Sequence, residues 1–285
     1  MTNVNVDHLR SWIGKQEILL DQVTRFPVAA LSATLDRDDP APQIGDELPP
    51  LWHWLYFLPT ARQSMLGPDG HPARGGFLPP VPLPRRMWAG GRFMFHQPLR
   101  VGETITRVST VQDVTVKHGR GGALCFVLVR HDISGEGGLA LVEEHDIVYR
   151  DVPQPGEAPS APKPARTDDT WRRDIQPSDA LLFRFSALTF NSHRIHYDRR
   201  YVTETEGYPG LIVHGPLIAT LLMDLLRRNT SQAVASFRFR AVSPLFDIAP
   251  FSVHGAPDGH GKAALWARSA EGNLAMEAEA ALASG

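Results

Sequence analysis

The chain has 285 residues, of which 42% are hydrophobic and 21% are charged, and its formal net charge is −2. This composition is typical of a globular protein with a buried core, and it offers no excess of positive charge to attract nucleic acid. The single cysteine, Cys125, excludes an intramolecular disulfide and a cysteine metal site. The first residues lack the pattern of a secretory signal, and no window approaches the ~18 apolar residues of a membrane span. We therefore expect a cytoplasmic protein without a membrane partner.

The first half of the chain predicts one buried helix followed by strands. Residues 23–36 form an apolar stretch, and residues 49–62, LPPLWHWLYFLPTA, are apolar all round and favour a buried helix. Strand-like runs follow at 90–99, 103–119, 123–133 and 139–151.

A proline-rich segment divides the chain. Residues 152–166, VPQPGEAPSAPKPAR, hold five prolines, which a helix interior or a central strand does not accept. The segment is typical of an extended surface linker. We therefore expect an N-terminal domain at 1–151, a linker at 152–168 and a C-terminal domain at 169–285.

The second half repeats the same order of elements. An apolar stretch at 181–191 precedes a polar segment, and residues 214–228, HGPLIATLLMDLLRR, have the spacing of a helix with one broad buried stripe. Strand-like runs follow at 233–242, 250–255, 262–269 and 274–282. A long helix wrapped by an antiparallel sheet is the hot-dog arrangement. The predicted fold is α+β, a double hot dog whose two sheets pair edge to edge.

The densest polar cluster in the chain is residues 190–200, FNSHRIHYDRR, just before the predicted helix. A polar loop beside a buried helix is where we expect a site. In this loop, the imidazole of His196 titrates near neutrality, so it can take a proton from water and return it. Asn191, His193 and Asp198 lie close by in sequence, and His196 is therefore the candidate catalytic base. A structural histidine is the alternative.

The start of the predicted helix is the second candidate feature. The backbone N–H groups at Gly215 and just beyond it are unpaired within the helix and lie at its positive end. They can stabilise the enolate oxygen that forms when the β-carbon of an unsaturated thioester is attacked. An ordinary helix cap is the alternative.

Other chemistries find less support. His193 and His196 are three residues apart with Asp198 near them, but no complete set of metal ligands appears, and we expect no catalytic metal. The nucleotide-binding GxGxxG and P-loop patterns are absent, and so is the GxSxG pattern of α/β-hydrolases.

The segment SALTFNSHRIHYD (186–198) with the downstream IVHG (212–215) resembles the signature of MaoC-like hydratases. Further motifs look like those of the type 2 hydroxyacyl-thioester dehydratases, a branch that includes mesaconyl-CoA and itaconyl-CoA hydratases. These motifs are GGFLPPVPLPRRMWAGG (75–91), PLRVGE (98–103), GLALVEEHDIVYR (138–150) and EGYPGLIVHGPL (206–217).

The resemblance implies reversible hydration of a 2-enoyl thioester, with coenzyme A as part of the substrate and no other cofactor. His196 falls on the catalytic histidine of the family, Gly215 on its oxyanion-hole glycine and Asn191 on its catalytic aspartate. An amide cannot act as a base, so we expect Asn191 to hold the water while His196 carries the proton transfer. The first half has no matching histidine cluster, so we expect one active site per chain, in the C-terminal half.

The same branch implies an acyl group that can carry a second carboxylate. Arg184, Arg194, Arg199 and Arg200 surround the site segment, and one of them can clamp such a carboxylate. Surface arginines, or arginines that bind the coenzyme A phosphates, are the alternative. The complete set of candidate substrate-binding residues is Arg184, His193, Arg194, Tyr197, Asp198, His214 and Trp88. Arg85, Arg86 and Trp88 lie in a first-half motif that either lines the acyl pocket or packs beneath it.

Two other functions stay open at this level. One is a hot-dog thioesterase, which would release free coenzyme A. The other is a non-catalytic acyl-thioester-binding protein that lost its activity through Asn191. Since hot-dog domains commonly pair, we also expect a homodimer.

Overall fold

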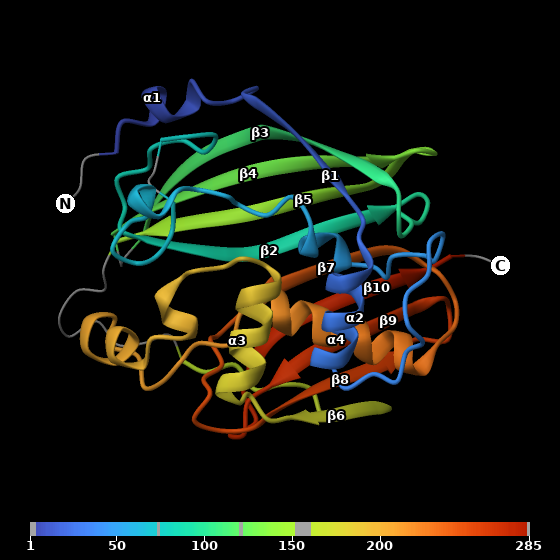
Figure 1. Cartoon of the computed structure of the whole chain (residues 1–285). Coiled ribbons are helices and arrows are strands. Elements are labelled where there is room, and N and C mark those ends of the chain that lie inside the picture. Colours follow the sequence, from blue (N-terminus) through green and yellow to red (C-terminus); the bar gives the residue numbers. More distant parts are fainter. Residues whose placement is uncertain (1–3, 73–74, 120–121, 152–160, 284–285) are drawn as a thin grey trace.

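The computed structural model describes residues 4–72, 75–119, 122–151 and 161–283. These residues form one ten-stranded sheet with helices packed against it (Figure 1). The strands are β1 (Gln16–Gln22), β2 (Arg85–Phe95), β3 (Thr104–Gly119), β4 (Gly122–Gly135), β5 (Gly138–Arg150), β6 (Trp171–Ile175), β7 (Val234–Ala241), β8 (Phe251–Pro257), β9 (Lys262–Arg268) and β10 (Leu274–Leu282). The α-helices are α1 (Val6–Arg10), α2 (Arg25–Thr34), α3 (Asp179–Leu188) and α4 (Gly215–Asn229). The single helical turns are η1 (Trp52–Leu55), η2 (Gln63–Met65), η3 (Arg194–His196) and η4 (Tyr201–Thr205).

The two halves of the sheet repeat one connectivity. From one edge the first half runs β1-β3-β4-β5-β2, and from the opposite edge the second half runs β6-β8-β9-β10-β7. Every neighbouring pair is antiparallel. The two halves join where β2 pairs with β7, with Gly90 opposite Arg240 and Met94 opposite Ser236. The prediction that both halves repeat one order of elements is confirmed. Because β2 pairs with β7, neither strand is left as an open sheet edge.

All eight predicted strands form, but the sequence does not predict β1 and β6. Both are the outermost strands of the sheet. In β1, Ile18 and Leu20 are 60% and 72% exposed, so the strand lacks a clear apolar face that would mark it. β6 has only five residues.

The long helix α4 is the centre of the second half. It lies on the face of the sheet formed by β6, β8, β9 and β10 (Figure 1). Ten consecutive residues, Leu217 to Leu226, are buried, and Pro216 in the first turn accepts the helix start because its missing N–H has no intrahelical partner to lose. The predicted helix is therefore confirmed.

A buried carboxylate fixes α4 to its surroundings. The side chain of Asp224 is 1% exposed and accepts hydrogen bonds from Arg37 at 2.7 Å, from Arg173 at 2.8 Å and from Arg228 at 2.8 Å. Arg37 follows α2, so the first half of the chain contributes directly to the charge balance around α4.

The predicted helix at residues 49–62 is wrong. Only the turn η1 is helical there, because Leu51 and Phe57 have positive φ angles of 70° and 56° and turn the chain at both ends of it. The apolar stretches at 23–36 and 181–191 instead form α2 and α3, which occupy equivalent positions and pack together. Among the described residues, no long helix therefore covers the sheet of the first half.

The predicted linker lies mostly on residues outside the described ranges. Of its described part, Pro164 forms one isolated bridge with Asn273 of the loop before β10. The domain boundaries at 151 and 169 stay a prediction. Within the described residues, no helix has the length and apolar character needed to span a membrane.

Candidate active site

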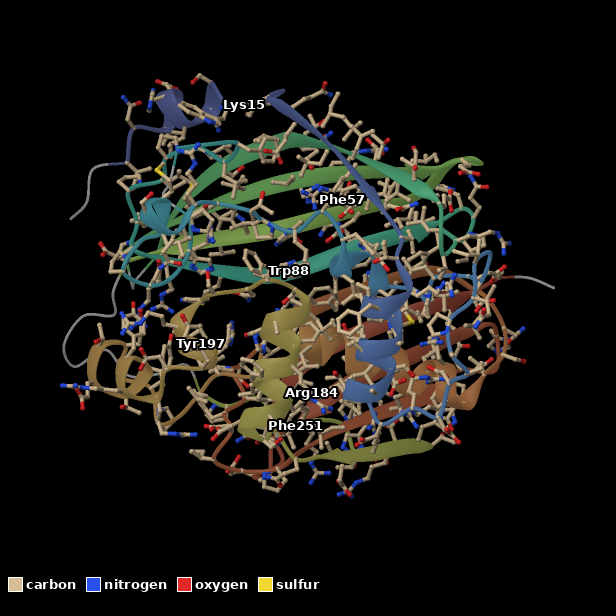
Figure 2. The ribbon with its side chains drawn as sticks, in the orientation of Figure 1. Lys15, Phe57, Trp88, Arg184, Tyr197 and Phe251 are labelled. Atoms are coloured by element: carbon tan, nitrogen blue, oxygen red, sulfur yellow. The ribbon has the colours of Figure 1, made fainter. Side chains whose placement is uncertain are left out.

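A cavity of about 890 Å³ is lined by residues from both halves of the chain. Strands β2 to β5 and the segments 53–72 and 75–79 contribute from the first half, and α3, the loop 189–192, Tyr197 and Pro216 contribute from the second half. Figure 2 shows Trp88 of β2 and Tyr197 on facing sides, and both residues line the cavity. The first half therefore supplies much of the wall around the candidate site.

His196 is not one of the residues that line this cavity, but the next residue in the chain, Tyr197, does line it. It ends the turn η3, and its side chain is buried, with the residue only 7% exposed. Its Nδ1 donates to the carbonyl oxygen of Ile212 at 2.7 Å, which leaves the lone pair on Nε2. Burial, opposed by this hydrogen bond, lowers the pKa of His196 to about 4. The imidazole is therefore neutral at pH 7, as a general base must be.

His214 packs against the ring of His196. The two rings are stacked with centroids 3.7 Å apart, and the Nε2 of His214 is 2.7 Å from Ser186 Oγ. Burial and the neighbouring His196 and His193 hold the pKa of His214 well below its ordinary value. His214 is also the residue that caps α4, so the stack fixes His196 relative to the helix start.

Asn191 is one of the residues that line the cavity. Its Oδ1 accepts the backbone N–H of His193 at 3.0 Å, and its own backbone N–H donates to Ser186 at 2.8 Å. Among the described residues, nothing accepts a hydrogen bond from its side-chain NH₂ group. The amide can therefore donate to a water or a substrate oxygen in the cavity, but it cannot take a proton.

The start of α4 is open toward an acceptor. The helix begins with the hydrogen bond from Ile218 to the carbonyl of His214 at 3.0 Å, and no acceptor in the described chain pairs with the N–H of Gly215 or Leu217. A Cβ built at Gly215 would meet no atom within 4 Å. The helix start therefore has free donors, a positive dipole end and room for an oxygen atom.

A loop from the first half docks on the site segment, and sequence reasoning missed it. The backbone carbonyl of Gly70 accepts a hydrogen bond from Ser192 Oγ at 2.6 Å, and the backbone carbonyl of Asp69 accepts one from the backbone N–H of Arg194 at 2.9 Å. A Cβ at Gly70 would lie 1.9 Å from the carbonyl oxygen of Ser192, so only glycine allows this contact. Because about 120 residues separate the two segments, nothing in the sequence pattern reveals the contact.

The same loop adds a histidine to the site. His71 is 3.0 Å from the carboxylate of Asp69, and its ring lies 4.0 Å from the ring of His193, which is 5.5 Å from that of His196. Burial, with His71 and His196 nearby, lowers the pKa of His193 to about 2. Burial alone would raise the pKa of Asp69, but its bonds to His71 hold it below the ordinary value. Potential ligand atoms of Asp69, His71 and His193 lie within 4.8 Å of one another, an arrangement that a metal ion can use. The expectation of no metal stays a prediction.

Most of the arginines proposed as carboxylate clamps are engaged elsewhere. Arg194 pairs with Asp198 at 2.7 Å, Arg199 with Asp247, and Arg200 with Glu204 at 2.9 Å. Arg184 is exposed on α3 and is not part of the cavity wall (Figure 2). None of the four arginines lines the cavity.

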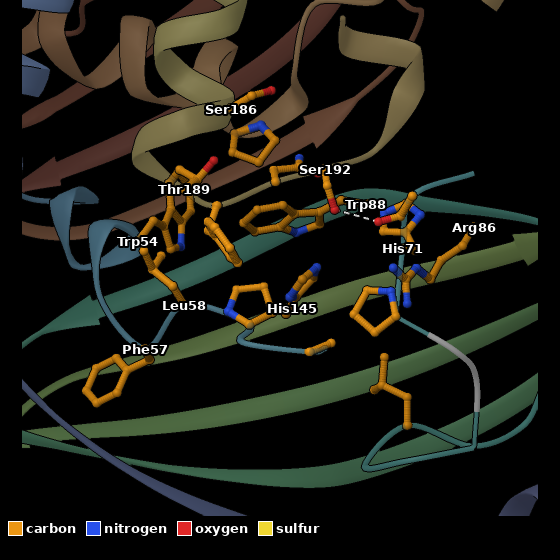
Figure 3. A pocket seen from close by; sticks show the side chains of 18 of the residues that line it. Trp54, Phe57, Leu58, His71, Arg86, Trp88, His145, Ser186, Thr189 and Ser192 are labelled. Carbon is orange, nitrogen blue, oxygen red and sulfur yellow. Dashed lines mark hydrogen bonds between the residues drawn. The ribbon is translucent and has the colours of Figure 1, made fainter. Parts of the chain in front are cut away.

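The first-half wall carries its own polar groups. Glu143 is buried, and its carboxylate forms hydrogen bonds with His53 Nε2 at 3.0 Å and Trp54 Nε1 at 3.2 Å. Burial would raise the pKa of Glu143, but the bond and charge of His53 bring it down to about 2. The ring of His145 packs against that of Trp88 with centroids 4.0 Å apart and a tilt of 36°, and burial lowers the pKa of His145 to about 3. Figure 3 shows Trp88 and His145 beside each other in the cavity, with Ser186 at its far side.

Comparisons with known proteins agree with this architecture. A MaoC-like dehydratase from Phytophthora capsici superposes with a TM-score of 0.66 at 14% identity, over 99% of this chain and 100% of that one. A Mycobacterium tuberculosis protein described as having a double hot-dog fold superposes with a TM-score of 0.57 at 14% identity, over 95% and 96% of the two chains. These similarities show the fold, and the predicted double hot dog is confirmed.

Sequence comparison reaches further. The mesaconyl-C(4)-CoA hydratase of Chloroflexus aurantiacus is 48% identical over 268 residues, which cover 94% of this chain and 95% of that protein. Residues 51–247 match the family model of hydroxyacyl-thioester dehydratase type 2. This match spans the cavity wall, the site segment and the start of α4. The chain belongs to the hydroxyacyl-thioester dehydratase type 2 family and is a hydro-lyase.

Proposed function

We propose that this protein catalyses the reversible hydration of a short, branched 2-enoyl-CoA that carries a second carboxylate, with mesaconyl-C(4)-CoA as the best candidate. The observation that carries the proposal is the 48% identity to a mesaconyl-C(4)-CoA hydratase over nearly the whole of both chains. The cavity agrees with it, because its wall combines aromatic rings with the guanidinium groups of Arg86 and Arg107 rather than a purely apolar surface.

Hydration begins at His196. Its Nε2 takes a proton from a water molecule that Asn191 holds by donating from its amide. The water oxygen forms a bond to the β-carbon, and the electron pair of the double bond moves through the α-carbon onto the thioester oxygen. The free N–H groups at Gly215 and Leu217 stabilise the resulting enolate. The α-carbon then takes the proton back from His196, so one water is added and no redox partner or cofactor beyond coenzyme A is used.

A small panel of thioesters tests the proposal. The purified chain is incubated with crotonyl-CoA, mesaconyl-C(4)-CoA, itaconyl-CoA and a medium-chain enoyl-CoA, and product masses are measured together with free thiol. The proposal expects hydrated thioester from mesaconyl-C(4)-CoA and no release of coenzyme A. Hydration of none of the four would contradict the proposal, and release of free thiol would point to a thioesterase. Activity on itaconyl-CoA, a homodimer and a cytoplasmic location remain predictions from the sequence.

A further inference from the structure

The second carboxylate of the proposed substrate needs a cationic partner near the reacting carbons. In mesaconyl-C(4)-CoA the thioester is at C4, so the free carboxylate is attached to the same β-carbon that water attacks. Its partner must therefore lie next to the catalytic groups. The arginines predicted from the sequence for this role are ion-paired or exposed outside the cavity, and two other arginines, Arg86 and Arg107, line the cavity instead.

Arg86 faces the cavity because of its place in β2. Successive side chains of a strand alternate between its two faces, so Arg86 and Trp88 share the face that lines the cavity. Arg85 is turned away: its guanidinium donates to the carbonyl of Glu206 at 3.0 Å and lies over the ring of Tyr208 at 5.3 Å. The side chain of Arg86 is half-buried, and its guanidinium forms no hydrogen bond or ion pair with any residue in the described ranges, although its backbone pairs with Tyr149 of β5.

Arg86 also lies at the reacting end of the cavity. Trp88, which shares the cavity-lining face of β2 with Arg86, has its ring 4.0 Å from that of His145, and the charge of Arg86 contributes to lowering the pKa of both His193 and His145. The ring of His193 is in turn 5.5 Å from that of His196. Figure 3 shows the side chain of Arg86 on the same side of the cavity as His71, whose ring contacts His193.

Arg107 has different surroundings. It comes from β3, and its guanidinium lies over the ring of Phe57 at 5.1 Å. Its charge acts on His131 and His145, and the acidic groups that act on it are Glu143, Glu17 and Asp21. Arg107 is therefore associated with the acidic groups of the first half rather than with the catalytic histidines.

A half-buried guanidinium without an anionic partner is costly unless a ligand supplies one. We propose that Arg86 binds the free carboxylate of the substrate and so selects diacid thioesters over neutral ones. This inference rests on the proposed function. The planar guanidinium can donate two parallel hydrogen bonds to the carboxylate and hold the β-carbon in place for attack by water.

Two saturated thioesters test the proposal without any turnover. Methylsuccinyl-CoA with the thioester at C4 and isovaleryl-CoA differ only in a carboxylate that replaces a methyl group. Their dissociation constants are measured by calorimetry for the wild type and for Arg86→Met, Arg86→Lys and Arg107→Met. We expect Arg86→Met to weaken binding of the diacid by about tenfold to a hundredfold, the usual range for a hydrogen bond to a charged group, with isovaleryl-CoA unaffected. The dissociation constant of Arg86→Lys for the diacid should lie between those of the wild type and Arg86→Met.

The controls separate the possible causes. Arg107→Met should change both dissociation constants by the same factor. If Arg86→Met weakens both ligands equally, Arg86 binds coenzyme A or serves the fold, and the proposal is wrong. It is also wrong if Arg107→Met alone removes the preference for the diacid.

Thermal unfolding of each variant shows whether it is folded. Hydration of mesaconyl-C(4)-CoA by the wild type is measured separately, so a failure of the proposed function is distinguished from a failure of the role of Arg86.

Discussion

His196 and His214 are stacked and almost fully buried, so the folded chain resists protonation of either ring. The pKa of His196 is about 4 in the folded protein, whereas an unfolded chain gives histidine a pKa of about 6.5. As the pH falls below the unfolded value, the unfolded state binds a proton that the folded state does not, and the free energy of unfolding decreases. Each such histidine contributes a slope of about 1.4 kcal/mol per pH unit until the folded pKa is reached.

From about pH 6.5 to pH 5, His196 should therefore cost about 2 kcal/mol of stability. The pKa of His214 is also held below its ordinary value in the folded chain, so His214 should add a loss of the same sign. The loss from His196 alone is a substantial part of a stability that is usually about 5–15 kcal/mol. Above this interval both rings are neutral in both states, so no stability is lost and the base form of His196 is available for catalysis.

Urea unfolding followed by circular dichroism at several pH values measures this slope. His196→Gln should reduce it by about 1.4 kcal/mol per pH unit relative to the wild type. His260→Gln, which changes an exposed histidine in the turn before β9, is the matched control and should keep the wild-type slope. Equal slopes for the wild type and His196→Gln would refute the reasoning, as would an NMR titration in which His196 takes up its proton near pH 6.5.

Three further predictions follow from the packing and the site. Asp224→Ala removes the buried counter-charge that three half-buried arginines share, and of these Arg37 keeps its pair with Asp39, so the free energy of unfolding should fall by about 3–5 kcal/mol in urea; a loss below about 1 kcal/mol would show that the cluster contributes little. Leu222→Ala, at a fully buried position of α4, should cost about 2–5 kcal/mol in the same assay, and a neutral result would mean that the core readily collapses around the cavity. Dialysis against EDTA should leave hydratase activity unchanged; a loss that added Zn²⁺ restores would instead make Asp69, His71 and His193 metal ligands.

The part of the site that is local in sequence was predictable. Asn191, His196 and Gly215 lie within one segment between α3 and α4, and the capping pattern of α4 identifies where the helix starts. The spacing of the large apolar residues in α4 likewise indicates a helix, although the structure buries every side of it from Leu217 to Leu226.

The rest depends on contacts between distant segments. His71 reaches His193 only because Gly70 lets two loops approach, and Arg86 reaches the same region only because β2 pairs with β7. The false helix at 49–62 has another cause. Aromatic and apolar residues on every side carry no periodic signal, and the left-handed conformations of Leu51 and Phe57 are set by tertiary packing rather than by local preference.

The central claim is that His196 adds water to an intact thioester. The most direct measurement incubates mesaconyl-C(4)-CoA with the protein in heavy-oxygen water and identifies the products by mass spectrometry, with His196→Gln as the matched variant. The structure predicts one labelled hydroxyl in an intact acyl-CoA for the wild type and no labelled product for the variant. Label found only in a free acid beside released coenzyme A, or hydration by His196→Gln at the wild-type rate, would contradict it.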